Sequence, residues 1–156
     1  MEATKQPYAF TREEGEALWF LGVPTRVLAT AKQTGGAFRL IEQVIPAGEA
    51  SPWHVHHTED EAFYVVEGQM TFLCGDQKVQ AGPGTFVYGP RGIPHGFRVE
   101  GTQPARMLLQ CTPGGFEHFI IEMSELTPST GPPDMEKLMA LAPKYDNEIL
   151  GPLPEY

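Results

Sequence analysis

The sequence predicts an all-β protein, a small barrel or jelly roll followed by one C-terminal α-helix. Three observations predict this class. Short runs rich in β-branched and aromatic residues recur between residues 17 and 112, clusters of glycine and proline separate these runs, and no helical pattern intervenes between them. The length of 156 residues is typical of one domain.

The predicted elements follow these turn signals in order. Residues 1–16 are polar and form a predicted N-terminal extension, with a possible turn of helix at residues 11–14. The predicted strands lie near residues 17–21, 25–30, 37–45, 61–66, 69–75, 85–88, 95–100 and 106–112. Residues 116–123 fit either a short helix or a last strand. The barrel is therefore predicted to span residues 17–123.

The C-terminal segment, residues 124–156, is predicted to be a helix and a tail packed on the barrel. Residues 134–144 place Met135, Leu138, Met139 and Ala142 on one stripe at helical spacing. Such a stripe is typical of a helix that packs on a core. The prolines near the C-terminus indicate an extended tail.

Composition and charge exclude several classes of partner. The formal net charge of −9 and the pI near 4.9 argue against nucleic acid and against anionic membranes. No apolar run approaches the length of a membrane span, and the first twenty residues lack the pattern of a signal peptide. Cys74 and Cys111 both lie in β-like runs and are predicted to be buried free thiols. We therefore expect a cytoplasmic protein.

Four residues carry the strongest chemical signal: His54, His56, Glu61 and His95. Residues i and i+2 of a strand point to the same face, so the two imidazoles of an extended His-x-His aim at one point. Glu61 opens the next apolar run, and His95 follows a proline- and glycine-rich turn. Three imidazole nitrogens and one carboxylate oxygen make a site for a divalent transition metal. These ligand types admit Fe, Ni, Mn, Co, Cu or Zn and leave the metal's identity open.

Neighbouring polar residues compete for the same role. His57 has the opposite strand parity to the two candidate histidines and is predicted to point away. Asp60 is disfavoured by parity, whereas Glu59 shares the parity of Glu61 and stays open as an alternative carboxylate. His118 has no neighbour at ligand spacing and is predicted to lie at the surface or behind the ligands.

The spacing of these residues resembles the two motifs of the cupins. From Gly48 the chain reads Gly-x5-His-x-His-x4-Glu-x6-Gly, and from Gly84 it reads Gly-x5-Pro-x-Gly-x2-His. The second motif usually ends in Asn four places after its His, but position 99 is Val. Fifteen residues separate Gly68 from Gly84, which resembles compact microbial single-cupin proteins. The resemblance implies a double-stranded β-helix barrel with the four residues above as metal ligands.

Further strings resemble the bacterial quercetin 2,3-dioxygenase-type single-cupin proteins. They are segments 54–65, 90–95 and 112–117, together with the Pro-Pro-Asp that leads into the predicted C-terminal helix. The resemblance covers most of residues 17–155. It implies that the metal binds a flavonol oxygen, that Glu61 removes the hydroxyl proton, and that dioxygen opens the heterocycle with loss of carbon monoxide.

Interior side chains at the barrel mouth are predicted to shape a ligand cavity beside the metal. Parity or position selects Phe63, Val65, Phe72, Phe86, Tyr88, Phe97 and Met107, although most such side chains, taken singly, are plain core. As a group they indicate an apolar or aromatic small-molecule substrate. Arg91 and Arg98 are the nearest cations in the sequence, so a polyanionic substrate fits less well.

Three functions stay open, because one fold hosts many chemistries. The first is a metal-dependent dioxygenase of the quercetinase type, with Glu61 as the catalytic base. The second is a non-catalytic protein that binds a metal or a small molecule, and the third is a metal-dependent isomerase or lyase. We expect a homodimer, because small barrels of this kind cover exposed sheet edges by pairing.

Overall fold

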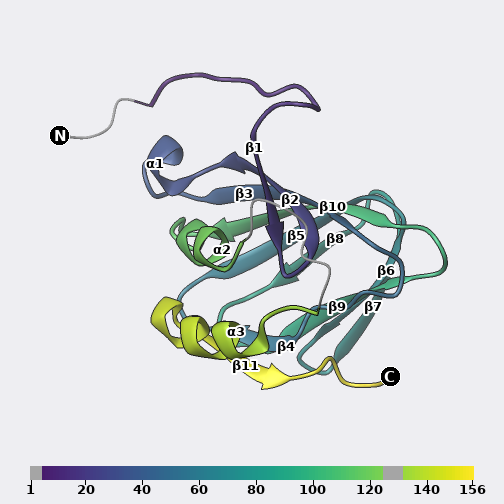
Figure 1. Cartoon of the computed structure of the whole chain (residues 1–156). Helices are drawn as coiled ribbons and strands as arrows, with labels where there is room; N and C mark the ends of the chain where they lie inside the picture. The colour runs from purple at the N-terminus through teal and green to yellow at the C-terminus, as the bar shows by residue number, and fades with distance from the viewer. Residues whose placement is uncertain (1–4, 125–131) are drawn as a thin grey trace.

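Two antiparallel β-sheets face each other and enclose the hydrophobic core (Figure 1). The structure is a computed structural model that describes residues 5–124 and 132–156. The six-stranded sheet has the order β1 (Glu16–Phe20), β2 (Val23–Ala29), β3 (Arg39–Ile45), β10 (Ala105–Thr112), β5 (Asp60–Glu67), β8 (Phe86–Gly89). The five-stranded sheet has the order β11 (Asn147–Gly151), β4 (Trp53–His56), β9 (His95–Glu100), β6 (Gln69–Cys74), β7 (Gln77–Ala81). These orders place strands that are distant in sequence side by side, as in a jelly roll, and confirm the predicted all-β class.

The strands at the centre of the six-stranded sheet form because their side chains alternate between a buried and a wetter face. In β3 and β10 every second residue is buried, which is the period of a strand with one face on the core. Leu109 of β10 lies opposite Ile41 of β3 on one side and opposite Phe63 of β5 on the other. This register fixes which residues of three strands share the inner face.

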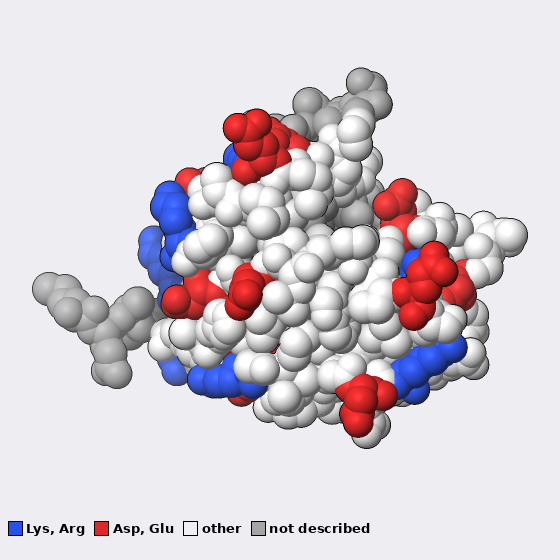
Figure 2. All heavy atoms as spheres, turned by 90° about the horizontal axis from the view of Figure 1, so that it is seen from below, with Lys and Arg blue, Asp and Glu red and all other residues white. Residues whose placement is uncertain are grey.

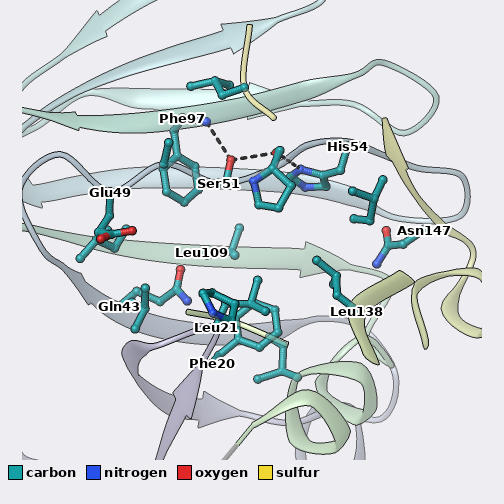
Figure 3. A pocket seen from close by; sticks show the side chains of 18 of the residues that line it. Phe20, Leu21, Gln43, Glu49, Ser51, His54, Phe97, Leu109, Leu138 and Asn147 are labelled. Carbon is teal, nitrogen blue, oxygen red and sulfur yellow. Dashed lines mark hydrogen bonds between the residues drawn. The ribbon is translucent and has the colours of Figure 1, made fainter. Parts of the chain in front are cut away.

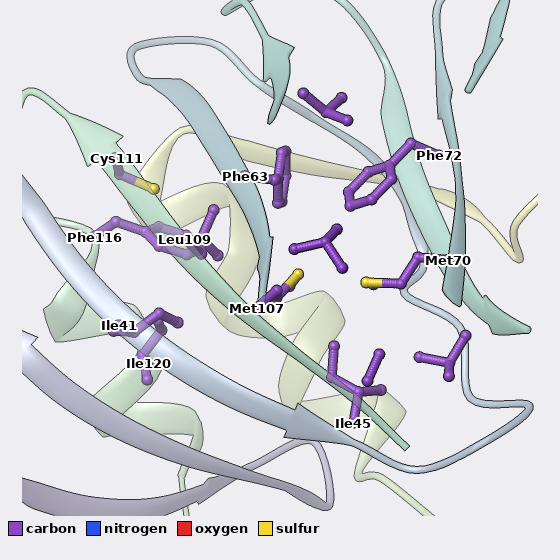
Figure 4. Close-up of a cluster of buried hydrophobic side chains, with 14 of the residues drawn as sticks. Ile41, Ile45, Phe63, Met70, Phe72, Met107, Leu109, Cys111, Phe116 and Ile120 are labelled. Carbon is purple, nitrogen blue, oxygen red and sulfur yellow. The ribbon is translucent and has the colours of Figure 1, made fainter. Parts of the chain in front are cut away.

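The core fills the space between the sheets and extends to the buried side chains of the helices (Figure 4). The rings of Phe63 on β5 and Phe72 on β6 join the two sheets with their centroids 5.1 Å apart. Met107 is fully buried and Met70 is nearly so beside these rings. Burying a side chain of this size stabilises the fold by about 1.5–3 kcal/mol, so this layer holds the two sheets at a fixed separation.

Short helices cover one side of the barrel (Figure 1). They are α1 (Ala31–Thr34), α2 (Glu117–Met123) and α3 (Met135–Leu141), the last followed by a 3-10 turn (Ala142–Tyr145). Helix α2 buries Phe119 and Ile120, and α3 buries Leu138. Among the described residues, no helix has the length and apolar character needed to cross a bilayer.

The structure decides one element that the sequence left open and differs from the prediction at four others. The ambiguous segment after residue 116 is helix α2, and the helix predicted over 134–144 ends at Leu141, because Pro143 enforces a 3-10 turn. Strand β7 and helix α1 were not predicted. Strand β11 also was not predicted, since it lies in the expected tail and only its first residue is buried. It pairs with β4, so the C-terminal tail completes the sheet that carries the histidine pair.

Candidate metal centre

The four candidate ligands come from three strands of the two facing sheets. His54 and His56 lie on β4, and His95 lies opposite His54 on the neighbouring strand β9. Glu61 comes from β5 of the other sheet. Strand parity turns both histidines of β4 inward, and the pairing of β4 with β9 brings the third imidazole beside them. The candidate site thus lies between the two sheets, with the three histidines on one sheet and the carboxylate on the other.

One carboxylate oxygen faces all three imidazoles. The Oε2 atom of Glu61 lies 2.8 Å from Nε2 of His95, 3.4 Å from Nε2 of His56 and 3.7 Å from Nε2 of His54. One ligand atom from each residue lies within 4.8 Å of all the others. Ligands at right angles around a first-row metal, each about 2.1 Å from it, are roughly 3 Å apart. The four side chains can therefore converge on one ion with small adjustments.

The hydrogen bonds behind the imidazoles select the tautomer that binds a metal. Nδ1 of His54 lies 2.8 Å from the carbonyl oxygen of Pro52, and Nδ1 of His95 lies 2.9 Å from that of Ile93. A carbonyl oxygen only accepts, so both Nδ1 atoms donate, and in the neutral ring Nε2 keeps its lone pair. Those lone pairs point into the site. The donor set and its orientation fit a divalent transition metal.

The charges of the site are strongly coupled. Burial alone opposes ionisation of His56, but the Coulombic attraction of Glu61, with help from Glu59, outweighs it and raises the pKa of His56 to about 9. Burial would raise the pKa of Glu61, but the positive charge of His56 and its hydrogen bond hold it well below its usual value. Desolvation lowers the pKa of His54. Glu61 is therefore ionised and poised to bind a cation.

Two local features position the candidate ligands His95 and Glu61. Gly89 of β8 lies opposite Glu61 and leaves room for the ring of His95. A Cβ at this position would lie only 3.3 Å from Nδ1 of His95. Asp60, next to Glu61, accepts hydrogen bonds from the backbone and guanidinium of Arg91 at 2.8–3.0 Å. This pair fastens the loop that leads to His95 against the strand that carries Glu61.

The competing polar residues take other places. His57 points outward, as predicted, and its Nε2 lies 3.0 Å from Glu148. His118 is exposed at the surface. Glu59 is buried behind His56, with its Oε2 atom 3.4 Å from Nδ1, and neither of these two atoms has a hydrogen-bond partner among the described residues. Glu59 is thus a neighbour of a ligand on its outer side.

Both cysteines are free thiols, as predicted. Cys111 is fully buried, whereas Cys74 is only partly buried, because it lies at the end of β6. Burial raises the pKa of each thiol.

A cavity of about 650 Å³ opens beside the candidate ligands (Figure 3), within the usual range for small-molecule sites. His54, Ser51 and Phe97 lie on one wall, and Gln43, Leu21 and Phe20 lie on the opposite wall. The remaining lining includes Ile41, Phe63, Leu109, Phe116, Phe119, Ile120, Leu138, Met139, Asn147 and Ile149. Most of the lining is apolar, so the cavity suits a ligand with an extended apolar body.

The side chains predicted to line a substrate pocket divide into three groups. Phe63 and Phe97 line the cavity. Val65, Phe72 and Met107 are not among the lining residues and are buried in the core beyond it. Phe86 and Tyr88 require a correction, because their side chains are 61% and 51% exposed on the outer face of β8. Val87 and Gly89 take the inner face of that strand instead, opposite Phe63 and Glu61.

The sequence did not predict several of the residues that line the cavity. Gln43 on β3 donates to the hydroxyl of Thr25 across the sheet and presents a polar group to the cavity. Asn147 is buried on β11 at the end of the cavity near α3 (Figure 3). Phe116 and Leu138 enter from the helical side. These positions lie far from the histidine motifs in sequence, and no local spacing links them to the site.

Comparison with known proteins identifies the domain. Residues 41–111 match the family model described as "Cupin domain". The chain is 33% identical over 113 residues to quercetin 2,3-dioxygenase of Bacillus subtilis, a match that covers 72% of this chain. The chain spans only about a third of the length of that relative, since the match covers 33% of it.

Solved structures share the architecture. An RmlC-like cupin from Shewanella frigidimarina superposes with a TM-score of 0.61 at 18% identity, over 75% of this chain and 100% of the other. Pac13, a nucleoside dehydratase, superposes with a TM-score of 0.62 at 15% identity, over 96% of this chain and 95% of the other. A structure of Streptomyces PAC13 is similar to the chain as well. At these identities the likeness concerns the fold alone.

Proposed function

Because the chain belongs to the cupin superfamily, we propose that it is a metal-dependent dioxygenase of the quercetinase type that acts on an enolic or aromatic small molecule. One observation carries the proposal: three imidazoles and one ionised carboxylate converge at the wall of an apolar cavity with aromatic sides. The likeness to quercetin 2,3-dioxygenase over 72% of the chain supports it further.

His54, His56, Glu61 and His95 would hold the metal, which is Fe, Ni, Mn, Co, Cu or Zn on the chemistry of its ligands. When bound, the metal supplies Lewis-acid polarisation of a substrate oxygen, which makes a hydroxyl proton easier to remove. Glu61 is the base that accepts this proton. Its low pKa keeps it ionised at neutral pH but makes it a weak base, so the proton transfer depends on a substrate hydroxyl that the metal would make more acidic.

The cavity walls bind and orient the substrate. Phe63 packs edge-on against His95, with ring centroids 5.9 Å apart, and against Phe97 at 6.1 Å. Gln43 of β3 and Leu21, in the turn between β1 and β2, face Phe97 across the cavity (Figure 3). The cavity of about 650 Å³ has a mostly apolar lining with aromatic rings in it, which suits an aromatic ring system. The apolar lining also excludes water from the reacting atoms.

Surface charge supports a small molecule as the partner. Figure 2 shows acidic side chains in several separate groups on one face, and the basic ones do not merge into a continuous stripe there. With a net charge of −9, the chain is poorly suited to bind a phosphate backbone. We further propose a cytoplasmic location, which the two free thiols support. We also propose a homodimer, because β8 is a sheet edge with the aromatic side chains Phe86 and Tyr88 exposed.

Oxygen consumption tests the enzymatic proposal. Protein loaded in turn with each candidate metal is assayed in an oxygen electrode against flavonols and other enolic or catecholic compounds. Glu61→Gln keeps the size of the side chain but removes the base, so turnover should fall by about two to four orders of magnitude. Glu67→Gln on the same strand, 60% exposed, is the control and should leave turnover unchanged. Retained activity in Glu61→Gln would exclude this role, and ligand binding without oxygen uptake would support a non-catalytic binding protein.

A further inference from the structure

A row of buried polar side chains crosses the inner face of the six-stranded sheet and ends at the candidate metal ligand Glu61. Arg39 of β3 lies opposite Cys111 of β10, and Cys111 lies opposite Glu61 of β5. Arg39 and Cys111 are fully buried, and Glu61 is 2% exposed. Strand register alone sets these three side chains next to one another, although they are far apart in sequence.

The direction of the hydrogen bonds along this row follows from the donors available. A guanidinium only donates, so the bond between Nη2 of Arg39 and Sγ of Cys111 uses the sulfur as acceptor. The single thiol proton is then free to point at Oε1 of Glu61, 3.2 Å from Sγ. A neutral thiol therefore joins a buried cation to a buried carboxylate.

The guanidinium of Arg39 makes no other hydrogen bond in the described part of the chain. Its Nε and Nη1 atoms are buried without a hydrogen-bond partner, and its guanidinium stacks 4.4 Å from the ring centroid of Phe116. That ring in turn packs edge-on against His56, with centroids 4.8 Å apart. A buried cation is costly unless a counter-charge or hydrogen bonds compensate it. The buried charge of Arg39 is compensated if it stabilises the anionic carboxylate of Glu61 through Cys111.

The two oxygens of Glu61 consequently have different surroundings. Oε2 faces the three imidazole Nε2 atoms, whereas Oε1 accepts from the thiol on the opposite side. We propose that Cys111 and Arg39 are positioning residues that make Glu61 a monodentate ligand through Oε2. A carboxylate that bound through both oxygens would occupy one more coordination position. Holding Oε1 away keeps that position for a substrate oxygen.

Infrared spectroscopy of the metal-free protein tests the hydrogen bond itself. The two thiols, Cys74 and Cys111, give S–H stretching bands in a region that other protein groups leave clear. The band of Cys111, assigned by its loss in Cys111→Ser, should lie at lower frequency than that of Cys74 and should move upward in Glu61→Ala. Arg39→Met should shift the Cys111 band and leave the Cys74 band in place, which makes Cys74 an internal reference. If neither Glu61→Ala nor Arg39→Met shifts the Cys111 band, the proposed hydrogen bonds between these side chains are refuted.

Cobalt binding tests the positioning role, which rests on the proposed metal site. In Co²⁺-loaded protein, X-ray absorption should show a monodentate carboxylate in the wild type and an additional oxygen ligand in Cys111→Val, with Co²⁺ affinity reduced about 10–100-fold. Cys111→Ser keeps a donor and should restore both properties. Val65→Ala, a fully buried position on the same strand as Glu61, controls for altered packing and should leave the coordination unchanged.

The outcomes separate the two proposals. A wild type that binds no Co²⁺ or other candidate metal would overturn the proposed function and the positioning role together. A wild type that binds Co²⁺ while Cys111→Val matches Val65→Ala in coordination and affinity would overturn the positioning role alone. If Cys111→Val does not fold, Arg39→Met decides, because it removes the donor to Sγ of Cys111: an additional oxygen ligand is expected in the Co²⁺-loaded protein, and coordination and affinity equal to the wild type would overturn the positioning role.

Discussion

Both carboxylate oxygens of Asp60 accept hydrogen bonds from Arg91. Oδ1 accepts from the backbone N–H and from Nε of Arg91 at 2.9 and 3.0 Å, and Oδ2 accepts from Nη2 at 2.8 Å. Nη2 also donates to the carbonyl oxygen of Thr112, so three segments meet at this pair. The pair joins the start of β5, where Glu61 lies, to the loop that ends at His95. It therefore fixes two candidate ligands from different sheets relative to each other.

The pair predicts a pH dependence of stability. Hydrogen bonds from the Arg91 side chain and backbone lower the pKa of Asp60 to about 2, from an ordinary value of 3.8. A lowered pKa in the folded state stabilises the protein at every pH above the unfolded value, and this contribution is lost as the pH falls from about 4 towards 2. Asp60→Asn should therefore lower the free energy of unfolding at pH 7 by about 1 kcal/mol or less, because the pair is partly exposed.

Urea unfolding between pH 7 and pH 2.5 measures this difference. The gap between wild type and Asp60→Asn should be largest near neutral pH and should shrink in the acid range. Asp76→Asn, in the exposed turn between β6 and β7, is the control and should show no such gap. A gap that grows on acidification would contradict the assignment.

Substituting one histidine of the strand β4 should remove the metal, while substituting its neighbour should not. His56→Ala deletes an imidazole that faces Glu61, and the site should lose most of its metal. His57→Ala removes the adjacent imidazole, which points outward to Glu148, so occupancy should stay near one ion per chain. Elemental analysis of protein purified without an affinity tag measures both. Full occupancy in His56→Ala would show that the ligand assignment is wrong.

Two motif glycines should differ in how much an added methyl group costs. Gly68 and Gly84 have φ angles of +87° and +88°, so either substitution to Ala carries backbone strain of about 1–2 kcal/mol. At Gly68 the new Cβ would also lie 2.6 Å from Cα of Ala105, whereas at Gly84 nothing lies within 4 Å. Gly68→Ala should therefore destabilise the protein clearly more than Gly84→Ala in urea unfolding. Equal losses would mean that the contact with Ala105 relaxes freely.

The exposed edge strand predicts where a homodimer would form. Phe86 on β8 lies opposite Tyr64 on β5, and both side chains are exposed, at 61% and 45%. If two copies pair here, Phe86→Glu should convert dimers to monomers in sedimentation velocity experiments. Ile121→Glu alters a comparably exposed residue on α2, 43% accessible, and should leave the dimer intact. A wild type that stays monomeric at high concentration would rule out the homodimer.

Local pattern was sufficient to predict much of the fold and the candidate ligands. Alternation along a strand fixes which residues share a face, so His54 and His56 could be placed together and His57 apart from them. Glycine and proline mark the turns, which located most strands to within a few residues. Where the pattern was ambiguous, the prediction failed: Phe86, Val87 and Tyr88 are all apolar, and only pairing with β5 decides which of them face outward.

The sequence by itself determined the all-β class, the approximate strands and the group of His54, His56, Glu61 and His95, because short-range spacing encodes these features. The tertiary structure alone decided which strands are neighbours. It brings Arg39 and Cys111, 72 residues apart, into contact behind Glu61. It also adds β11 beside β4 and closes the cavity with Leu138 of α3. These relationships depend on sheet order and on the packing of whole elements, which no local period of side chains records.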